Sequence, residues 1–270
     1  MNSGVAGDRK PARVLTIAGS DSSGGAGIQA DVKTLSAFGV YAMTAVTAVT
    51  VQDTLGVHAV HPVPAAIVRD QIACVLGDIG ADAIKIGMLG SADIVAAVGQ
   101  ALERYASIPL VLDTVMIAKG GATLLNDSAV EALKSLLLPR ADLVTPNAPE
   151  AARLADVRVE SASDLVQSGQ ALIAMGARAA LVKGGHLSGP TVTDVLVTAY
   201  DVHFFKARRI DTRSTHGTGC TLSTAVAAGL AQGMSLLDSV ARAHAFVQEA
   251  IRTAPGLGSG AGPLNLLRKM

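Results

Sequence analysis

A glycine-rich segment near residue 217 combines residue types that bind an anion and accept a proton. The heptapeptide Thr215-His216-Gly217-Thr218-Gly219-Cys220-Thr221 follows a strand-like run and opens an apolar helical run at 222–231. Glycines let a ligand approach the backbone closely, and the free N–H groups of a helix's first turn favour negative charge. The segment predicts an anion cradle at Gly217, Thr218 and Gly219. A glycine turn that only caps the helix is the alternative.

Cys220 stands beside the predicted anion, where an attacking hydroxyl would need a base. A thiol at a helix N-terminus has a lowered pKa, so its thiolate could accept the hydroxyl proton. The alternative is a small buried hydrophobic residue, which is what most free cysteines are.

Asp31 and Gln52 are expected near the carboxyl ends of two strands, where open parallel sheets bind ligands. Asp31 lies one turn into a predicted helix at 28–38, and Gln52 follows a predicted strand at 41–51. A carboxylate and an amide can together recognise an aromatic ring that carries an amino group and ring nitrogens. A solvated helix residue and a turn residue remain the alternatives.

Three oxygen-bearing side chains, Asp113, Asn147 and Glu150, fall at or just past two further strand ends. Mg²⁺ prefers oxygen ligands and keeps several waters when nucleotide phosphates carry it in. Asn147 as a helix cap and Glu150 as a favourable first-turn charge are the alternatives. Lys183, before two glycines, could bind phosphate as a point charge. The six histidines include no i, i+4 pair, so we predict no zinc site.

Alternating strands and helices are predicted to position these residues. The expected strands are 14–18, 41–51, 57–61, 83–86, 110–112, 143–145, 180–182, 193–198 and 203–209. The expected helices are 28–38, 64–76, 92–105, 128–138, 149–154, 161–175, 217–231 and 235–253. This order predicts an α/β fold with a mostly parallel sheet and helices on both faces. The strands 193–198 and 203–209 have no helix between them, which predicts an antiparallel pair.

Length and composition favour one large domain. The chain has 270 residues, of which 50% are hydrophobic and only 3% aromatic, as strands covered on both faces require. We predict a flexible tail at 1–12 and a single domain at 13–270. Residues 34–52 carry no charge, but their β-branched run at 44–51 predicts a buried strand rather than a membrane span.

Charge and cysteine content narrow the class of partner. Lys and Arg total 22, as do Asp and Glu, and no extended basic cluster occurs, so nucleic acid is not an expected partner, and neither is a membrane. The two cysteines, Cys74 and Cys220, fit a reducing compartment better than a disulfide scaffold. We therefore expect a cytoplasmic protein.

With these residues in view, the chain resembles the hydroxymethylpyrimidine/phosphomethylpyrimidine kinases of thiamine biosynthesis, which have the ribokinase-like fold. The resemblance runs from about Val14 to Leu266. Its motifs are TIAGSDSSGGAGIQAD at 16–31, KIGMLG at 85–90, LDTVMIAK at 112–119, TPNAPEA at 145–151, LVKGGH at 181–186 and THGTGCT at 215–221. Ser22 and Asp53 stand where proline and asparagine are common in the family. Ser259 and Ala261 stand where histidine is frequent.

The resemblance implies a three-layer kinase domain that uses ATP and Mg²⁺. The implied reactions are phosphorylation of 4-amino-5-hydroxymethyl-2-methylpyrimidine to its monophosphate, and then to its diphosphate. A homodimer is among the assemblies that the resemblance allows. The resemblance implies that Cys220 is the base and that Gly217, Thr218 and Gly219 form the anion hole. It implies that Asp31 and Gln52 bind the pyrimidine, in a pocket lined by Gly19, Ala26, Met88 and Val115. It also implies that Lys183 and Thr215 contact the nucleotide, and that Asp113, Asn147 and Glu150 surround Mg²⁺.

Two other functions compete with this one. Pyridoxal kinases of the same fold act on a similar hydroxymethyl-bearing heteroaromatic ring. A catalytically silent pyrimidine-binding protein would keep Asp31 and Gln52 but lose the anion hole, which this sequence retains.

Overall fold

Strands and helices alternate along the chain in the predicted order. The computed structural model describes residues 10–117, 121 and 123–267, so the predicted tail up to residue 9 and the motif residues 118–119 lie outside the described part. The strands are β1 (Arg13–Ser20), β2 (Tyr41–Gln52), β3 (Val57–Pro62), β4 (Ala83–Ile86), β5 (Leu110–Leu112), β6 (Leu143–Val144), β7 (Ala179–Val182), β8 (Thr191–Thr198) and β9 (Val202–Arg208). The helices are α1 (Gly27–Ala37), α2 (Ala65–Asp78), α3 (Ala92–Leu102), α4 (Asp127–Leu136), α5 (Ala148–Ala155), α6 (Ala162–Ala174), α7 (Thr218–Ala231) and α8 (Leu236–Arg252).

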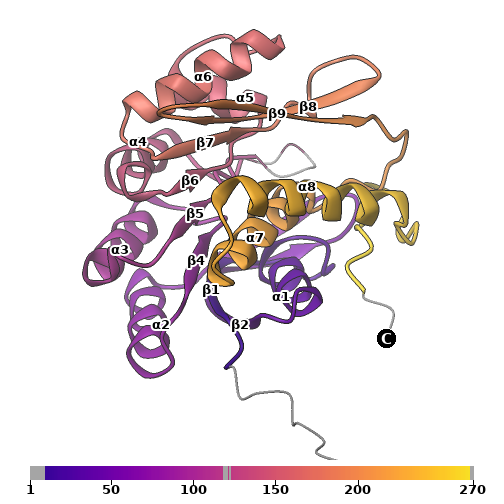
Figure 1. Cartoon of the computed structure of the whole chain (residues 1–270). Helices are drawn as coiled ribbons and strands as arrows, with labels where there is room; N and C mark the ends of the chain where they lie inside the picture. Colours follow the sequence, from indigo (N-terminus) through magenta and orange to yellow (C-terminus); the bar gives the residue numbers. More distant parts are fainter. Residues whose placement is uncertain (1–9, 118–120, 122, 268–270) are drawn as a thin grey trace, which may run out of the picture.

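The strands described by the structure form one sheet in the order β3-β2-β1-β4-β5-β6-β7-β8-β9 (Figure 1). Pairing is parallel from β2 through β7. It is antiparallel where β3 joins β2, where β8 joins β7, and between β8 and β9. The predicted mostly parallel sheet and the predicted antiparallel pair are therefore confirmed. The carboxyl ends of the parallel strands meet at one edge, which places the loops after β1, β4, β5, β6 and β7 side by side.

Helices cover both faces of the sheet and make two cores. Leu15 and Ile17 of β1 face a core that extends through α2, α3, α4, α5 and α6. Val14 faces the opposite core, formed with α1, α7 and α8. Burial on both faces explains the unbroken hydrophobic runs of β4, β5 and β7. Figure 1 shows α1, α7 and α8 gathered on one side of the sheet.

Three predicted elements differ in detail from those observed. The predicted helix 92–105 is α3 followed by a 3-10 turn, η1 (Glu103–Tyr105). The predicted helix 128–138 ends earlier, and a 3-10 turn, η2 (Leu138–Arg140), follows it because Pro139 cannot continue an α-helix. The run 44–51 is a strand as predicted but is not fully buried, because the side chains of Val49 and Val51 are 51% and 59% exposed.

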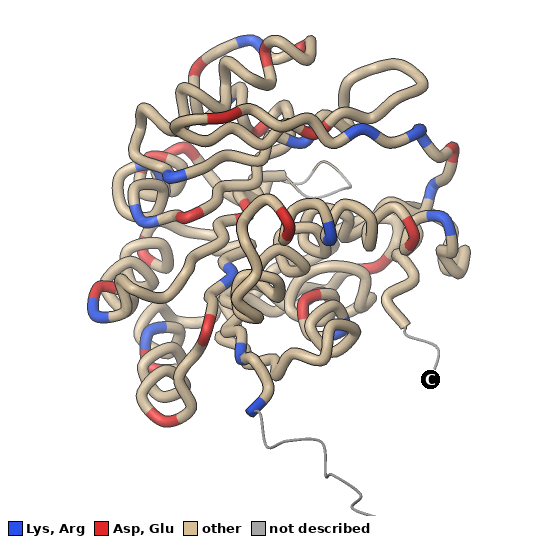
Figure 2. Tube along the Cα trace, in the orientation of Figure 1, with Lys and Arg blue, Asp and Glu red and all other residues tan. Residues whose placement is uncertain are grey.

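Charged residues are dispersed over the molecule. Figure 2 shows basic and acidic positions interspersed along the described trace. Among the described helices, none combines the length and the apolar character required to cross a membrane.

Candidate active site

A cavity of about 620 Å³ opens at the carboxyl ends of the parallel strands. All but one of the residues predicted to bind or react line it, although they come from seven separate segments of the chain. They are Gly19, Ala26, Gln52, Met88, Asp113, Val115, Asn147, Glu150, Lys183, Thr215, Gly217, Thr218, Gly219 and Cys220. The exception is Asp31. The sequence pattern therefore located the cavity, and chain topology brings its walls together.

The first turn of α7 has the geometry of an anion cradle. Gly217 is the N-cap residue in the left-handed region, with φ +79, and no side chain caps the helix among the described residues. A Cβ at Gly217 would collide with the backbone oxygen of Gly25, so only glycine fits this close approach. The start of α7 can thus receive a bound anion at the positive end of the helix dipole, where the Thr218 N–H makes only a long, 3.4 Å hydrogen bond to the Thr215 carbonyl.

Cys220 lies where two helices begin. It is in the first turn of α7, and the backbone N–H of Gly27, the first residue of α1, donates to its thiol. Burial nevertheless raises the pKa of the Cys220 thiol to about 12, although Lys85 and the Gly27 N–H favour the thiolate. The expectation of a lowered thiol pKa is wrong for this arrangement, because desolvation outweighs the nearby positive charge.

Asp31 forms part of a buried ion pair and does not line the cavity. Its side chain is 0% exposed, and both carboxylate oxygens lie 3.0 Å from the Nζ atom of Lys85. The hydroxyls of Thr16 and Thr224 donate to the same carboxylate at 2.7 and 2.6 Å. These contacts occupy the acceptor oxygens, so the predicted contact between Asp31 and a pyrimidine does not fit the structure. Asp31 instead joins α1 to β4 and α7.

Asp113 and Lys183 pair across the floor of the cavity. The Nζ atom of Lys183 lies 3.1 Å from Oδ1 of Asp113, and Thr145 donates to the same oxygen at 3.2 Å. Burial alone would raise the pKa of Asp113, but Lys183 and Lys85 hold it below its usual value. The second oxygen, Oδ2, is buried without a hydrogen-bond partner in the described part of the chain.

Asn147 and Glu150 form a capping box at the start of α5. The Oδ1 atom of Asn147 accepts from the Glu150 N–H at 2.9 Å, and Oε2 of Glu150 accepts from the Asn147 N–H at 2.9 Å. This geometry supports the capping alternative for Asn147 rather than its predicted place as a metal ligand. Burial raises the pKa of Glu150, so a cation near this carboxylate would favour its ionised form.

The donor set fits Mg²⁺ carried on a phosphate ligand. Asp113 offers an unpartnered carboxylate oxygen, and Glu150 lies within the same cavity wall. No group of three His, Cys, Asp or Glu able to hold a metal occurs among residues 10–117, 121 and 123–267. Since Mg²⁺ typically takes one or two carboxylates and fills its remaining positions with waters and substrate phosphates, this small set is sufficient.

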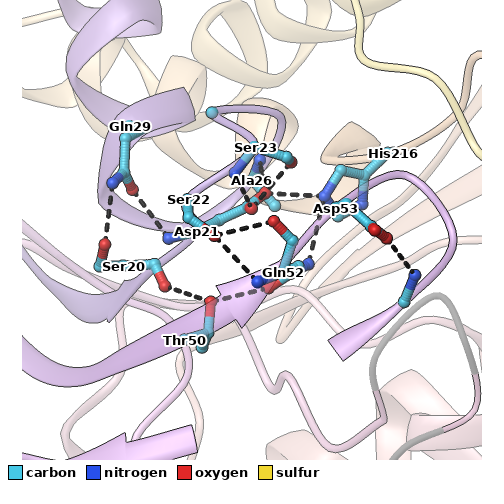
Figure 3. Close-up of polar contacts among 12 residues, drawn as sticks. Ser20, Asp21, Ser22, Ser23, Ala26, Gln29, Thr50, Gln52, Asp53 and His216 are labelled. Carbon is cyan, nitrogen blue, oxygen red and sulfur yellow. Dashed lines mark hydrogen bonds and ion pairs between the residues drawn. The ribbon is translucent and has the colours of Figure 1, made fainter. Parts of the chain in front are cut away.

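A polar cluster around Gln52 was not predicted from the sequence beyond Gln52 itself (Figure 3). Asp21, which follows β1, lies 2.8 Å from the Nε2 atom of His216, through its Oδ2 atom. The Nε2 atom of Gln52 lies 3.3 Å from the same ring nitrogen, and the Oε1 atom of Gln52 lies 3.2 Å from the hydroxyl of Thr50. Asp21 and His216 both stand inside motifs that the sequence singled out, but nothing in the spacing indicated that they meet across 195 positions.

Comparison with known proteins identifies the family. The family model described as phosphomethylpyrimidine kinase matches residues 21–265. The chain belongs to the phosphomethylpyrimidine kinase family. Family membership makes it a phosphotransferase, and the fold described above is the ribokinase-like fold that the resemblance implied.

Relatives in this family align with this chain over nearly its whole length. The hydroxymethylpyrimidine/phosphomethylpyrimidine kinase of Bacillus subtilis is 45% identical and covers 94% of each chain. The thiamine biosynthesis bifunctional protein ThiED of Geobacter sulfurreducens is 46% identical over 93% of this chain, which spans 51% of that longer protein. Among solved structures, an ADP complex of Bacillus subtilis pyridoxal kinase has a TM-score of 0.89 at 36% identity, covering 94% of this chain and 97% of that one.

Proposed function

We propose that this kinase phosphorylates 4-amino-5-hydroxymethyl-2-methylpyrimidine with ATP, and then phosphorylates the monophosphate to the diphosphate, as a step of thiamine diphosphate biosynthesis. One observation carries the proposal: a hydrogen-bonding amide, Gln52, shares a single cavity with Cys220 and the uncapped start of α7. The 45% identical Bacillus subtilis relative, named for both phosphorylations, supports it.

The proposed reaction assigns a task to each wall of the cavity. Gln52 holds the ring, with Gly19, Ala26, Met88 and Val115 around it, so that the hydroxymethyl group faces Cys220. The thiolate of Cys220 accepts the hydroxyl proton while the oxygen attacks the γ-phosphorus of ATP; the bond from that phosphorus to the β,γ-bridging oxygen breaks, and ADP leaves. The N–H groups of Gly217, Thr218 and Gly219 stabilise negative charge on the transferred group.

Positive charge on the nucleotide side comes from the chain and from the metal. Lys183 and Thr215 both line the cavity; Lys183 binds the phosphates of ATP, and Thr215 also contacts the nucleotide. Asp113 and Glu150 would hold Mg²⁺, which when bound neutralises charge between the β- and γ-phosphates. The unpartnered oxygen of Asp113 supports this assignment.

Pyridoxal kinase is the second candidate. It is supported by the TM-score of 0.89 to the Bacillus subtilis pyridoxal kinase. Identity to that structure is 36%, whereas identity to the Bacillus subtilis pyrimidine kinase is 45%. The pyrimidine reaction is therefore the better supported of the two.

A coupled ADP-release assay tests both candidates. We expect Mg-ATP-dependent turnover with the hydroxymethylpyrimidine and with its monophosphate, and a kcat/KM for pyridoxal at least about tenfold lower, because pyridoxal has no ring amino group for the Gln52 carbonyl. Folded protein that turns over neither pyrimidine would overturn the proposal. Preferential turnover of pyridoxal would establish the second candidate.

The setting of the enzyme is proposed on separate grounds. Cys74 and Cys220 are both free thiols, which supports a cytoplasmic, reducing compartment. Exposed apolar side chains near the β3 edge of the sheet support a homodimer.

A further inference from the structure

The Gln52 amide lies between His216 and Thr50, which have different hydrogen-bonding requirements. The Nε2 atom of Gln52 lies 3.3 Å from the Nε2 atom of His216, and the Oε1 atom of Gln52 lies 3.2 Å from the Thr50 hydroxyl (Figure 3). An amide oxygen and an amide nitrogen have nearly the same shape, so the hydrogen-bonding requirements of the neighbours decide which end is which.

Asp21 fixes the proton on His216. The carboxylate of Asp21 is buried, and backbone N–H groups donate to both of its oxygens: Ala26 to Oδ2 at 2.7 Å and Ser23 to Oδ1 at 2.9 Å. Burial alone would raise the pKa of Asp21, yet its hydrogen bonds to His216 and Ser23 hold that pKa below the usual value. An ionised carboxylate only accepts, so the Nε2 atom of His216, 2.8 Å away, must carry a hydrogen. An amide NH₂ group facing this N–H would set two donors against each other.

Thr50 imposes the same orientation from the other end. Its hydroxyl has one proton, which it donates to the backbone oxygen of Ser20 at 2.7 Å. The 3.2 Å contact from this hydroxyl to Oε1 of Gln52 would need the same proton and is the longer of the two, so the Thr50 oxygen is left to accept from Gln52. It requires the amide NH₂ group on its side.

We propose that Asp21, His216 and Thr50 are positioning residues that fix the Gln52 amide with its carbonyl toward His216 and its NH₂ group toward Thr50, so that the two amide atoms are exchanged relative to Figure 3. One oxygen lone pair and one N–H then remain for the cavity, in a fixed order. This edge complements an aromatic ring in which an amino group adjoins a ring nitrogen. The identity of that ring rests on the proposed function, but the orientation itself does not.

Two substitutions of His216 separate orientation from packing. His216→Gln supplies an amide N–H near the position of Nε2, whereas His216→Phe keeps an aromatic ring against Gly25 and removes the N–H. We expect His216→Phe to lower the ratio of kcat/KM for the hydroxymethylpyrimidine to kcat/KM for pyridoxal by about tenfold. His216→Gln should retain most of the parent ratio.

Two controls accompany this series. Ser23→Ala removes a hydroxyl that donates at 2.8 Å to the other Asp21 oxygen, so it perturbs the same loop and should leave the selectivity ratio unchanged. Thr50→Val should lower the ratio as His216→Phe does, and Thr50→Ser should restore it. If His216→Phe preserves the ratio as well as or better than His216→Gln, the ring only packs and the proposal is overturned.

A spectroscopic measurement tests the orientation without any substrate. In ¹⁵N-labelled protein, the Gln52 NH₂ signals are assigned by their loss in Gln52→Glu. We expect nuclear Overhauser effects from these protons to the Thr50 methyl group that are stronger than those to the His216 ring. Stronger effects to the His216 ring than to the Thr50 methyl group would overturn the proposal. Parent enzyme that fails to phosphorylate the pyrimidine would sink only the proposed function, because this measurement still decides the orientation.

Discussion

Cys220 must lose its proton before it can act as a base, and its surroundings oppose that loss. Burial raises the thiol pKa to about 12, while Lys85 lowers it and the carboxylates of Asp113 and Asp31 raise it. Below that pKa, the thiolate fraction grows about tenfold for each pH unit. We therefore expect kcat/KM for the pyrimidine to rise with pH through the neutral and alkaline range in which the protein stays folded.

Substitution at this position tests the same assignment. Cys220→Ser should slow phosphoryl transfer by about 10²–10⁴-fold, because a hydroxyl does not ionise in this range. Cys220→Asp should retain more activity than Cys220→Ser and should lose the rise with pH, since a carboxylate near Lys85 is already ionised. Steady-state rates between pH 6 and pH 9, with substrate binding measured separately, give the answer. If Cys220→Ser matches the parent at every pH, the thiol only packs.

Short motifs predicted the site residues whose surroundings are local in sequence. Gly217 to Cys220 begin one helix, and the role of each follows from its place in that turn. Asp31 could not be predicted in the same way, because its partners, Lys85 and Thr224, lie 54 and 193 positions away. A buried ion pair is a property of the assembled layers, and spacing along one helix carries no signal of it.

At the scale of elements, the Asp31–Lys85 ion pair joins α1 to β4, and the hydrogen bond from Thr224 to Asp31 adds α7. Asp31 lies one turn after Gly27 in α1, and Thr224 lies one turn after Cys220 in α7, while Lys85 comes from β4. Both side chains of the ion pair are 0% exposed. Removing one partner of such a pair leaves an uncompensated buried charge.

Lys85→Met should lower the free energy of unfolding by about 3–5 kcal/mol. The double substitution Asp31→Asn with Lys85→Met should recover part of this loss, because no unpaired charge remains. Urea unfolding monitored by circular dichroism measures both changes. The matched control is Arg252→Ala, which breaks an exposed pair with Glu249 and should leave the midpoint unchanged. A Lys85→Met variant as stable as the parent would show that the Asp31–Lys85 pair does not stabilise the packing of α1 against β4.

The order of elements followed from hydrophobic periodicity, whereas their ends and their exposure did not. Each predicted strand and helix is present, because continuous apolar runs and amphipathic runs report on burial within one element. The exposure of Val49 and Val51 was missed because it depends on sheet order: β2 lies second from the edge, and only β3 lies beyond it.

At the scale of the whole molecule, the β3 edge of the sheet is the surface that a second copy of this chain would cover in a homodimer. Val49, Val51 and Val60 are 51%, 59% and 43% exposed, whereas Ala48 and Thr50, which alternate with them along β2, are buried. β3 is an edge strand of the described sheet, and exposed apolar edges favour pairing with another chain. These observations support the proposed homodimer.

Light scattering coupled to size-exclusion chromatography tests the assembly. We expect a mass twice the 27.3 kDa of one chain, and a mass near that of one chain when Val49→Lys and Val51→Lys are combined, because two buried ammonium groups would be set into the interface. Tyr200→Ser is the matched control, since Tyr200 is 93% exposed at the turn between β8 and β9. It removes a larger apolar surface from the far edge of the sheet and should leave the mass unchanged. A parent protein that elutes with the mass of one chain would show that there is no homodimer. A Tyr200→Ser variant that dissociates as the lysine variant does would show that the contact does not lie at the β3 edge.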